Sequence, residues 1–104
     1  SPENIAKWRE LPAEMGWDFV YDQRPFFVHS TNVNMMQYFI DEQQLMVEYK
    51  GKNGKPNSAY LYSNVTEKEA ISFFQSSSKG VQVWNILRVR GSKTAHKKPY
   101  ARIK

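Results

Sequence analysis

Hydrophobic and polar residues alternate along the middle of the chain with the two-residue period of a half-buried β-strand. Residues 45–49 read Leu-Met-Val-Glu-Tyr, and an apolar, aromatic run precedes them at residues 35–40. Residues 41–44, Asp-Glu-Gln-Gln, form a polar reversal between the two segments. Residues 50–57 contain Asn-Gly and Pro, which tight reversals need, and a third extended segment follows at about residues 58–62. The pattern predicts an antiparallel meander of at least three strands.

The period changes to that of an α-helix after the third strand. Thr66 and Glu69 have the spacing of a capping box, in which the threonine hydroxyl accepts from the Glu69 amide and the carboxylate accepts from the Thr66 amide. Apolar residues then recur on one face at Ala70, Phe73 and Phe74. This spacing predicts a helix of about three turns that packs its aromatic stripe on the sheet.

A second short helix is predicted to follow the first. Residues 76–80, Ser-Ser-Ser-Lys-Gly, are expected to end the first helix, because Gly80 can take the left-handed conformation that helix ends favour. The second helix is expected from Val81 to about Val89. Arg88 and Arg90 then lie at its outer or terminal positions.

The chain before residue 29 adds three short elements. Residues 5–11 place Ile, Trp and Leu at three-residue spacing until Pro12, which predicts a short N-terminal helix. Residues 17–21 carry Trp, Phe and Tyr at alternate positions, which indicates a short strand, and residues 22–25 are a turn into an extended piece at 26–28. The whole pattern predicts the α+β class: an antiparallel meander followed by two short helices, with an extra N-terminal helix.

Composition places the chain among folded domains. It has 104 residues, of which 40% are hydrophobic and 14% aromatic, enough for one domain with its own core. It has no run of about 18 apolar residues, so no membrane span is predicted. It also has no cysteine, which excludes disulfides and thiolate ligands. We expect a cytoplasmic protein.

Charge is divided unevenly along the chain. The first 69 residues hold 7 basic and 10 acidic side chains, whereas no acidic residue and 8 basic residues follow Glu69, so the net charge of +5 comes from the C-terminal part. A field of one sign at one end suits a polyanion, because each Lys or Arg that neutralises a phosphate releases counterions. Nucleic acid is the partner this predicts. The alternative is a solvated basic tail that keeps the protein soluble.

An ordered set of residues resembles the KTSC domain, which is named for its place at the C-terminus of some lysyl-tRNA synthetases and also occurs as a short stand-alone protein in bacteria and their phages. Its hallmark is a Tyr-x-Tyr followed by a helix and a Ser-x-Gly element leading to an Asn. The matching residues are Ser30, Val33, Tyr38, residues 45–49, residues 60–65, Ala70, Phe73, Phe74, residues 78–80, Trp84, Asn85 and Arg88.

The resemblance divides the chain into three parts. Residues 28–92 match the domain, residues 1–27 are an N-terminal extension with a helix and a strand, and residues 93–104 are a basic C-terminal tail. The loop at residues 50–57 is longer than the family's usual tight reversal. RNA binding has been proposed for the family from its synthetase context, so the resemblance implies the fold and suggests RNA as a partner.

Catalytic chemistry finds little support in the sequence. The two histidines, His29 and His96, are far apart and in no metal-ligand spacing, and each is expected to be structural or solvent-exposed. Residues 51–55, Gly-Lys-Asn-Gly-Lys, lack the four residues between glycines that a phosphate loop of the Walker type needs. We therefore expect no catalytic residue, no metal and no organic cofactor, and not an enzyme.

The candidate nucleic-acid contacts are basic residues in two regions. Arg88 and Arg90 are expected to make fixed contacts, because a helix holds them and a guanidinium can grip phosphate in a bidentate manner. The basic residues that follow, Lys104 included, are expected to be mobile point charges. The full set comprises Arg88, Arg90, Lys93, Lys97, Lys98 and Arg102 in the C-terminal segment, and Lys50, Lys52 and Lys55 in the loop.

Two tyrosines are further candidates. Tyr60 and Tyr62 are two apart on one predicted strand, so they project to the same face. If that face is open, they form a platform on which bases of a single strand stack; if the helix covers it, they belong to the core. Trp84 has the same two interpretations, as a stacking residue beside Arg88 or as a plug between helix and sheet.

Two classes of function follow. The first is a non-catalytic nucleic-acid-binding module, for RNA or single strands rather than for sequence-specific duplex DNA, since no helix-turn-helix, zinc-finger or RNP1 sequence occurs. The alternative is a protein-interaction or assembly module, with a phage as one source, whose basic segment docks an acidic partner. The sequence leaves the oligomeric state open.

Overall fold

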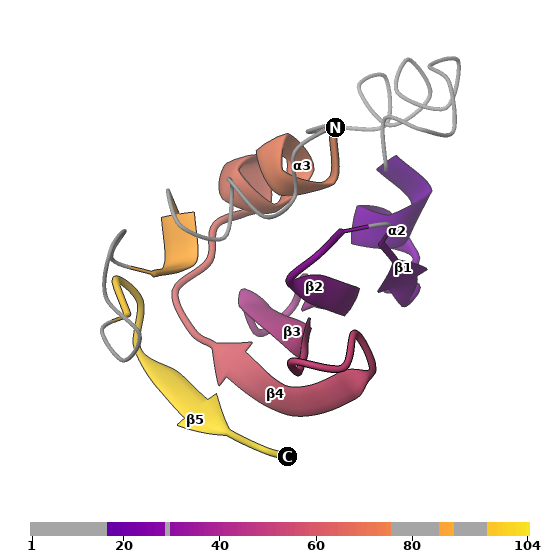
Figure 1. Ribbon diagram of the computed structural model, residues 1–104. Coiled ribbons are helices and arrows are strands. Elements are labelled where there is room, and N and C mark those ends of the chain that lie inside the picture. Colours follow the sequence, from indigo (N-terminus) through magenta and orange to yellow (C-terminus); the bar gives the residue numbers. More distant parts are fainter. Residues whose placement is uncertain (1–16, 29, 76–85, 89–95) are drawn as a thin grey trace.

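A five-stranded antiparallel sheet in the strand order β1-β2-β3-β4-β5 forms the body of the protein (Figure 1). It is seen in a computed structural model, which describes residues 17–28, 30–75, 86–88 and 96–104. The elements are α2 (Trp17–Tyr21), β1 (Phe26–Phe27), β2 (Val33–Phe39), β3 (Gln44–Lys50), β4 (Pro56–Tyr62), α3 (Glu67–Gln75) and β5 (Tyr100–Arg102). The predicted α+β class and the predicted meander are confirmed, since β2, β3 and β4 follow one another as neighbours.

The register of the meander sets which side chains share a face. Leu45 on β3 lies opposite both Tyr38 on β2 and Tyr62 on β4, and Val47 lies opposite Tyr60. Because directly opposed residues of antiparallel strands project to the same side, these residues form one apolar face. The tight turn between β2 and β3 ends at Gln43, which has a positive φ of 52°.

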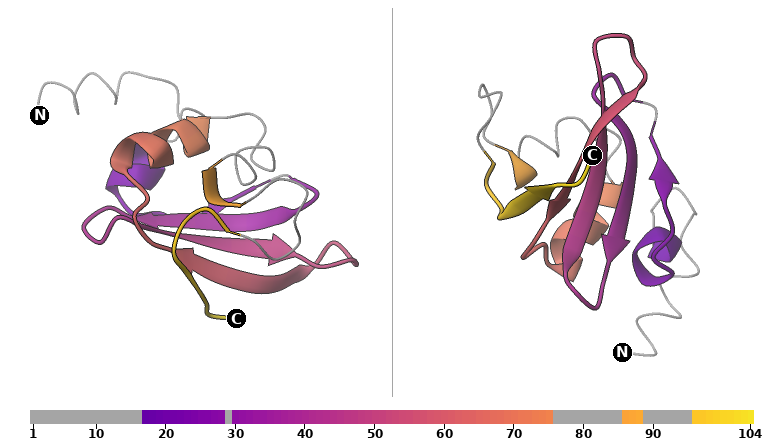
Figure 2. Two further views of the ribbon diagram at one scale, coloured as in Figure 1. Left: turned by 90° about the vertical axis from the view of Figure 1, so that its left-hand side faces the viewer. Right: turned by 90° about the horizontal axis from the view of Figure 1, so that it is seen from below.

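The core lies between that face and the helices. Figure 2 shows α2 and α3 on one side of the sheet, and the other side carries no helix of the described part of the chain. Among the described residues, Tyr38, Tyr62, Phe73 and Phe74 are the largest fully buried side chains, and Leu87 joins the same cluster. Burying one such large apolar side chain stabilises the fold by about 1.5–3 kcal/mol.

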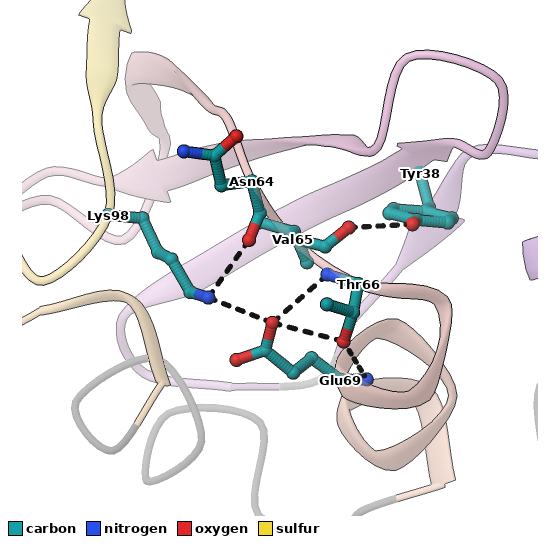
Figure 3. A network of polar contacts seen from close by, with 6 residues as sticks. All are labelled: Tyr38, Asn64, Val65, Thr66, Glu69 and Lys98. Atoms are coloured by element: carbon teal, nitrogen blue, oxygen red, sulfur yellow. Dashed lines mark hydrogen bonds and ion pairs between the residues drawn. The ribbon is translucent and has the colours of Figure 1, made fainter.

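The predicted capping box at the start of α3 is confirmed (Figure 3). The Glu69 amide donates to the Thr66 hydroxyl at 3.1 Å, and the Thr66 amide donates to Glu69 Oε1 at 3.0 Å. Just before the cap, the buried Tyr38 hydroxyl donates to the Val65 carbonyl at 2.7 Å. The cap and this bond fix the beginning of α3 over β2.

The strand predicted at residues 17–21 is wrong, because this segment is the helix α2. Phe19 and Val20 both face the interior: the Phe19 ring lies edge-on to Phe26 at 4.6 Å between ring centroids, and Val20 is fully buried. A strand would turn one of two adjacent residues away from the core. Contacts with α3 and β2 therefore override the alternating pattern.

The predicted second helix ends before the residue at which the sequence pattern placed its end. Ile86 and Leu87 lie in a helical turn, but Arg88 has left it and forms an isolated antiparallel β-bridge with His96. A helix that continues to Val89 is therefore wrong. The remainder of that helix, the N-terminal helix predicted at residues 5–11 and the end of α3 predicted at residues 76–80 lie outside the described residues.

The C-terminal residues are part of the sheet. Tyr100 and Arg102 on β5 lie opposite Tyr62 and Tyr60 on β4, and the Ile103 amide donates to the Ala59 carbonyl at 2.9 Å. Figure 1 shows β5 beside β4 at the edge of the sheet. The expectation of a mobile tail is therefore wrong for residues 99–104, because backbone pairing gives them a fixed place that their low apolar content does not predict.

Candidate nucleic-acid interface

The pairing of β4 with β5 gathers aromatic and basic side chains at one edge of the sheet. Its register places Tyr60 opposite Arg102 and Tyr62 opposite Tyr100, so all four project to the face that α3 partly covers. The bridge between Arg88 and His96 brings two more side chains to the same place. We call this group the edge cluster: Tyr49, Tyr60, Tyr62, Arg88, His96, Tyr100 and Arg102.

The rings of the edge cluster form a continuous layer. The His96 and Tyr100 rings are closest, with centroids 3.9 Å apart and planes inclined by 33°. The Tyr60 ring lies 5.3 Å from His96 and 5.7 Å from Tyr100. Tyr100 remains 51% exposed and Tyr60 is partly buried, so the outer side of the layer meets solvent.

A chain of hydroxyl groups runs beneath this layer. The Tyr49 and Tyr62 hydroxyl oxygens are 2.6 Å apart, and the Tyr62 oxygen lies 3.1 Å from His96 Nδ1. Burial raises the pKa of Tyr62 to about 12 and raises that of Tyr49 further, so both phenols stay protonated at neutral pH. Burial and the nearby Arg88 charge lower the pKa of His96 below 6.5, which keeps its imidazole neutral there.

The structure answers the question left open for the two predicted tyrosines. Tyr62 is fully buried and belongs to the core, whereas Tyr60 is partly buried at the edge. The sequence interpretation missed Tyr100 and gave His96 no part in the interface. The available signal was the alternation of Tyr100 and Arg102 in the tail, which is typical of a short strand.

Two arginines flank the aromatic layer. The Arg88 guanidinium carbon lies 5.6 Å from the Tyr49 ring centroid, and that of Arg102 lies 6.0 Å from the Tyr60 centroid. Such cation–π contacts hold a guanidinium near a ring. The Arg102 Nε also donates to the Lys104 carbonyl at 3.0 Å, and Lys97, next to His96, is exposed. The arginines are thus positioned by the fold.

Two of the predicted mobile charges are held in ion pairs, so this part of the prediction is wrong. Lys98 Nζ lies 2.8 Å from Glu69 Oε1 and also donates to the Asn64 carbonyl at 2.9 Å (Figure 3). Lys104 Nζ lies 2.7 Å from Glu48 Oε2. Acidic residues from the first two thirds of the chain therefore neutralise part of the basic C-terminal segment, which a count along the sequence does not reveal.

The lysine loop joins β3 to β4. Lys52 and Lys55 are exposed at its tip, where Gly54 has a φ of 74°, while Lys50 Nζ donates to the Ser30 carbonyl at 2.7 Å. The loop precedes the first residue of β4. Because β5 is antiparallel to β4, the C-terminal end of β5 points toward the end of the sheet where this loop lies. The structure therefore places the loop beyond the end of β5, apart from the aromatic layer.

Several predicted residues lie outside the described part of the chain. They are Arg90, Lys93, Trp84 and His29. Among the described residues, no group of three His, Asp or Glu side chains is arranged to hold a metal ion, and no helix has the length and apolar character to cross a membrane. The expectation that the protein has no metal, cofactor or activity stays a prediction.

Comparison with known proteins identifies the architecture. No family model matches the chain, and no curated protein matches it. Among solved structures, the crystal structure of a KTSC domain protein from Yersinia pestis is similar, with a TM-score of 0.61 and 20% sequence identity; the match covers 78% of this chain and 97% of that one. The likeness of fold that the Tyr-x-Tyr pattern suggested is thereby confirmed. The chain has the fold of a KTSC domain.

Proposed function

We propose that this protein is a small non-catalytic module that binds single-stranded nucleic acid, RNA in the first place, through its edge cluster. The observation that carries the proposal is the exposed Tyr100 ring, which lies beside the partly exposed Tyr60 with Arg102 next to both. Aromatic rings with an adjacent guanidinium are the elements with which proteins stack the bases and hold the backbone of a single strand.

The shape of the site supports a single strand rather than a duplex. The rings lie at a sheet edge, and none of the described helices carries a basic stripe that could enter a major groove. Base stacking contributes about 1–3 kcal/mol per base. Lys52 and Lys55 lie beyond the end of β5, where they are placed to contact phosphates of a strand that continues along it.

The similarity to a KTSC domain adds to the proposal without carrying it. We infer that the chain is a divergent member of that family and works in the cytoplasm, where single-stranded RNA is available. The absence of cysteine agrees with a reducing compartment.

The test is binding of a fluorescently labelled oligouridylate of about ten nucleotides to the full chain, followed by anisotropy. Replacement of Tyr100 by Ala is expected to lower the affinity by about tenfold, since one stacked base is lost. Phe27→Ala is the matched control, because Phe27 is an aromatic residue that is 69% exposed on β1, at the opposite edge of the sheet. Its affinity is expected to remain that of the unmodified protein.

A second pair of variants tests the contribution of positive charge to binding. Arg102→Gln is expected to weaken binding and flatten its dependence on salt, which should have a slope of about −0.7 per neutralised phosphate. Lys68→Gln removes the same charge from an exposed residue of α3 that is not part of the edge cluster, and it should change the affinity less. Equal affinities in Tyr100→Ala and the unmodified protein, or tighter binding of polyglutamate than of the oligonucleotide, would contradict the proposal; the latter would favour an acidic protein partner.

A further inference from the structure

The hydrogen bonds beneath the edge cluster require one protonation state of His96. A neutral imidazole that accepts at Nδ1 lets Tyr62 donate to His96 while Tyr49 donates to Tyr62, so each hydroxyl hydrogen has an acceptor. Tyr49 is only 7% exposed, and among the described residues the Tyr62 hydroxyl is its one hydrogen-bond partner. The chain of hydroxyls is therefore complete only when His96 is neutral.

Protonation of His96 reverses this chain. Both ring nitrogens of an imidazolium donate, so the Tyr62 oxygen must accept from Nδ1 and its hydrogen must turn toward Tyr49. The buried Tyr49 hydroxyl hydrogen then has no acceptor among the described residues, which is costly in the protein interior. Arg88 adds a second penalty, because it is paired with His96 through the β-bridge and carries the same charge.

His96 also joins the C-terminal segment to the rest of the sheet, because it bridges Arg88 and its ring lies beside those of Tyr60 and Tyr62 on β4. The groups that face it are Tyr60 and Tyr62 on β4, Arg88 from the 86–88 segment, and Tyr100 on β5. None of these described groups is a carboxylate that could compensate an added positive charge. A protonated His96 is therefore disfavoured in the place that the closed sheet gives it.

We propose that His96 is an acid-sensitive latch that holds β5 on β4, and that mild acid weakens nucleic-acid binding because it loosens this strand. The second half rests on the function proposed above, since the latch positions Tyr100 and Arg102 beside Tyr60. The first half concerns the protein alone and is tested without any ligand.

The pH range of the effect follows from the shift. The pKa of His96 is lowered from 6.5 by burial and by Arg88, so the stability it contributes is complete above pH 6.5 and is lost as the pH falls from there through the folded-state value. One proton can change the opening equilibrium by at most about tenfold per pH unit. The carboxylates paired with Lys98 and Lys104 have pKa values lowered from 4.5, so both ion pairs persist at about pH 5.5.

The latch is tested by amide hydrogen exchange in the ligand-free full chain at about pH 7.5 and about pH 5.5, corrected for intrinsic exchange rates. The reporting amides are those of Ile103, which donates to Ala59, and Ser63, which donates to Pro99. We expect their protection to fall by about three- to tenfold in acid. The Val65 amide, which donates to the Gln43 carbonyl away from β5, is the internal control and should not change.

His96→Asn is the matched variant. The asparagine carbonyl oxygen lies close to the place of Nδ1 and accepts a hydrogen bond, but it cannot take up a proton. Protection of Ile103 and Ser63 in this variant is expected to be the same at both pH values. An equal acid-induced loss in the variant, or no loss in the unmodified protein, would overturn the latch. So would an imidazole titration midpoint at or above 6.5 for His96 by NMR, a measurement that needs no variant.

Binding of the labelled oligouridylate at fixed ionic strength tests the second half. A basic protein ordinarily binds a polyanion more tightly in acid, because its net positive charge rises. The latch predicts the reverse: binding about threefold or more weaker at pH 5.5 than at pH 7.5, and no such weakening in His96→Asn. Binding that tightens equally in both proteins would refute the coupling. No binding at either pH, together with acid-induced loss of protection, would refute the proposed function and confirm the latch.

Discussion

At the scale of single residues, Glu69 has an unusually central position. Its Oε1 accepts from the Thr66 amide, from the Thr66 hydroxyl at 3.1 Å and from Lys98 Nζ at 2.8 Å (Figure 3). Burial raises its pKa, but the bonds from Lys98 and Thr66 outweigh this, and the net shift is downward from 4.5. One carboxylate thus caps α3 and ties the C-terminal segment to it.

Replacement of Thr66 by Ala is expected to lower the free energy of unfolding by about 1 kcal/mol, because the Glu69 amide loses its capping acceptor. Thr66→Ser keeps the hydroxyl and should lose much less. Urea unfolding at neutral pH followed by circular dichroism measures both. Equal stability of Thr66→Ala and the unmodified protein would mean that the cap contributes nothing in solution.

At the scale of elements, a helix or strand could be predicted from the sequence when residues within the element or next to it determine its conformation. The strands β2, β3 and β4 and the cap of α3 were predictable, because alternation, turn residues and the Thr66/Glu69 spacing are written within a few positions. The five-residue helix α2 and the three-residue strand β5 were not. Elements this short have weak patterns, and contacts with distant parts of the chain decide their form.

The same distinction holds for the candidate site. Arg88, Arg102 and Tyr60 were identified from charge and from the Tyr-x-Tyr spacing, and the structure brings them to one edge. Tyr100 and His96 reach that edge through pairing with β4 and Arg88, which no local pattern indicates. The ion pairs of Lys98 and Lys104 were missed for the same reason, since their partners lie far away in sequence.

The aromatic contacts that join α2, β1 and α3 predict a large effect of one side chain. Phe74 is fully buried, with its ring 5.7 Å from Phe26 and 6.3 Å from Phe19. Phe74→Ala should lower the free energy of unfolding by about 3–5 kcal/mol.

Phe74→Leu keeps most of the apolar volume and is expected to cost less than Phe74→Ala, which separates packing from the loss of ring contacts. The exposed Phe27 serves as control, since Phe27→Ala should stay within about 0.5 kcal/mol of the unmodified protein. Thermal or urea unfolding gives these differences. A loss in Phe74→Ala no greater than that in Phe27→Ala would contradict the packing described for α3.

At the scale of the whole molecule, the two faces of the sheet differ in what covers them, and the basic residues lie along one edge. The helices cover one face, and the described part of the other face is lined by Met35, Phe39, Met46 and Leu61, all partly buried. The positive C-terminal segment runs along the β4 edge, where Glu48 and Glu69 neutralise two of its lysines. The uncompensated positive charge at this edge is therefore smaller than the number of basic residues in the C-terminal segment indicates.

The position of β5 also sets an order of events during folding. The meander from β2 to β4 is built from neighbouring hairpins, whereas β5 must close a loop over much of the second half of the chain before it pairs. Distant pairings form more slowly, because loop-closure entropy is lost before contacts compensate it. In pulse-labelled refolding, the Ile103 amide should become protected after that of Val65. A chain in which only the hairpins have formed has the sheet face of the core, but it lacks the β4–β5 edge on which the proposed RNA site depends.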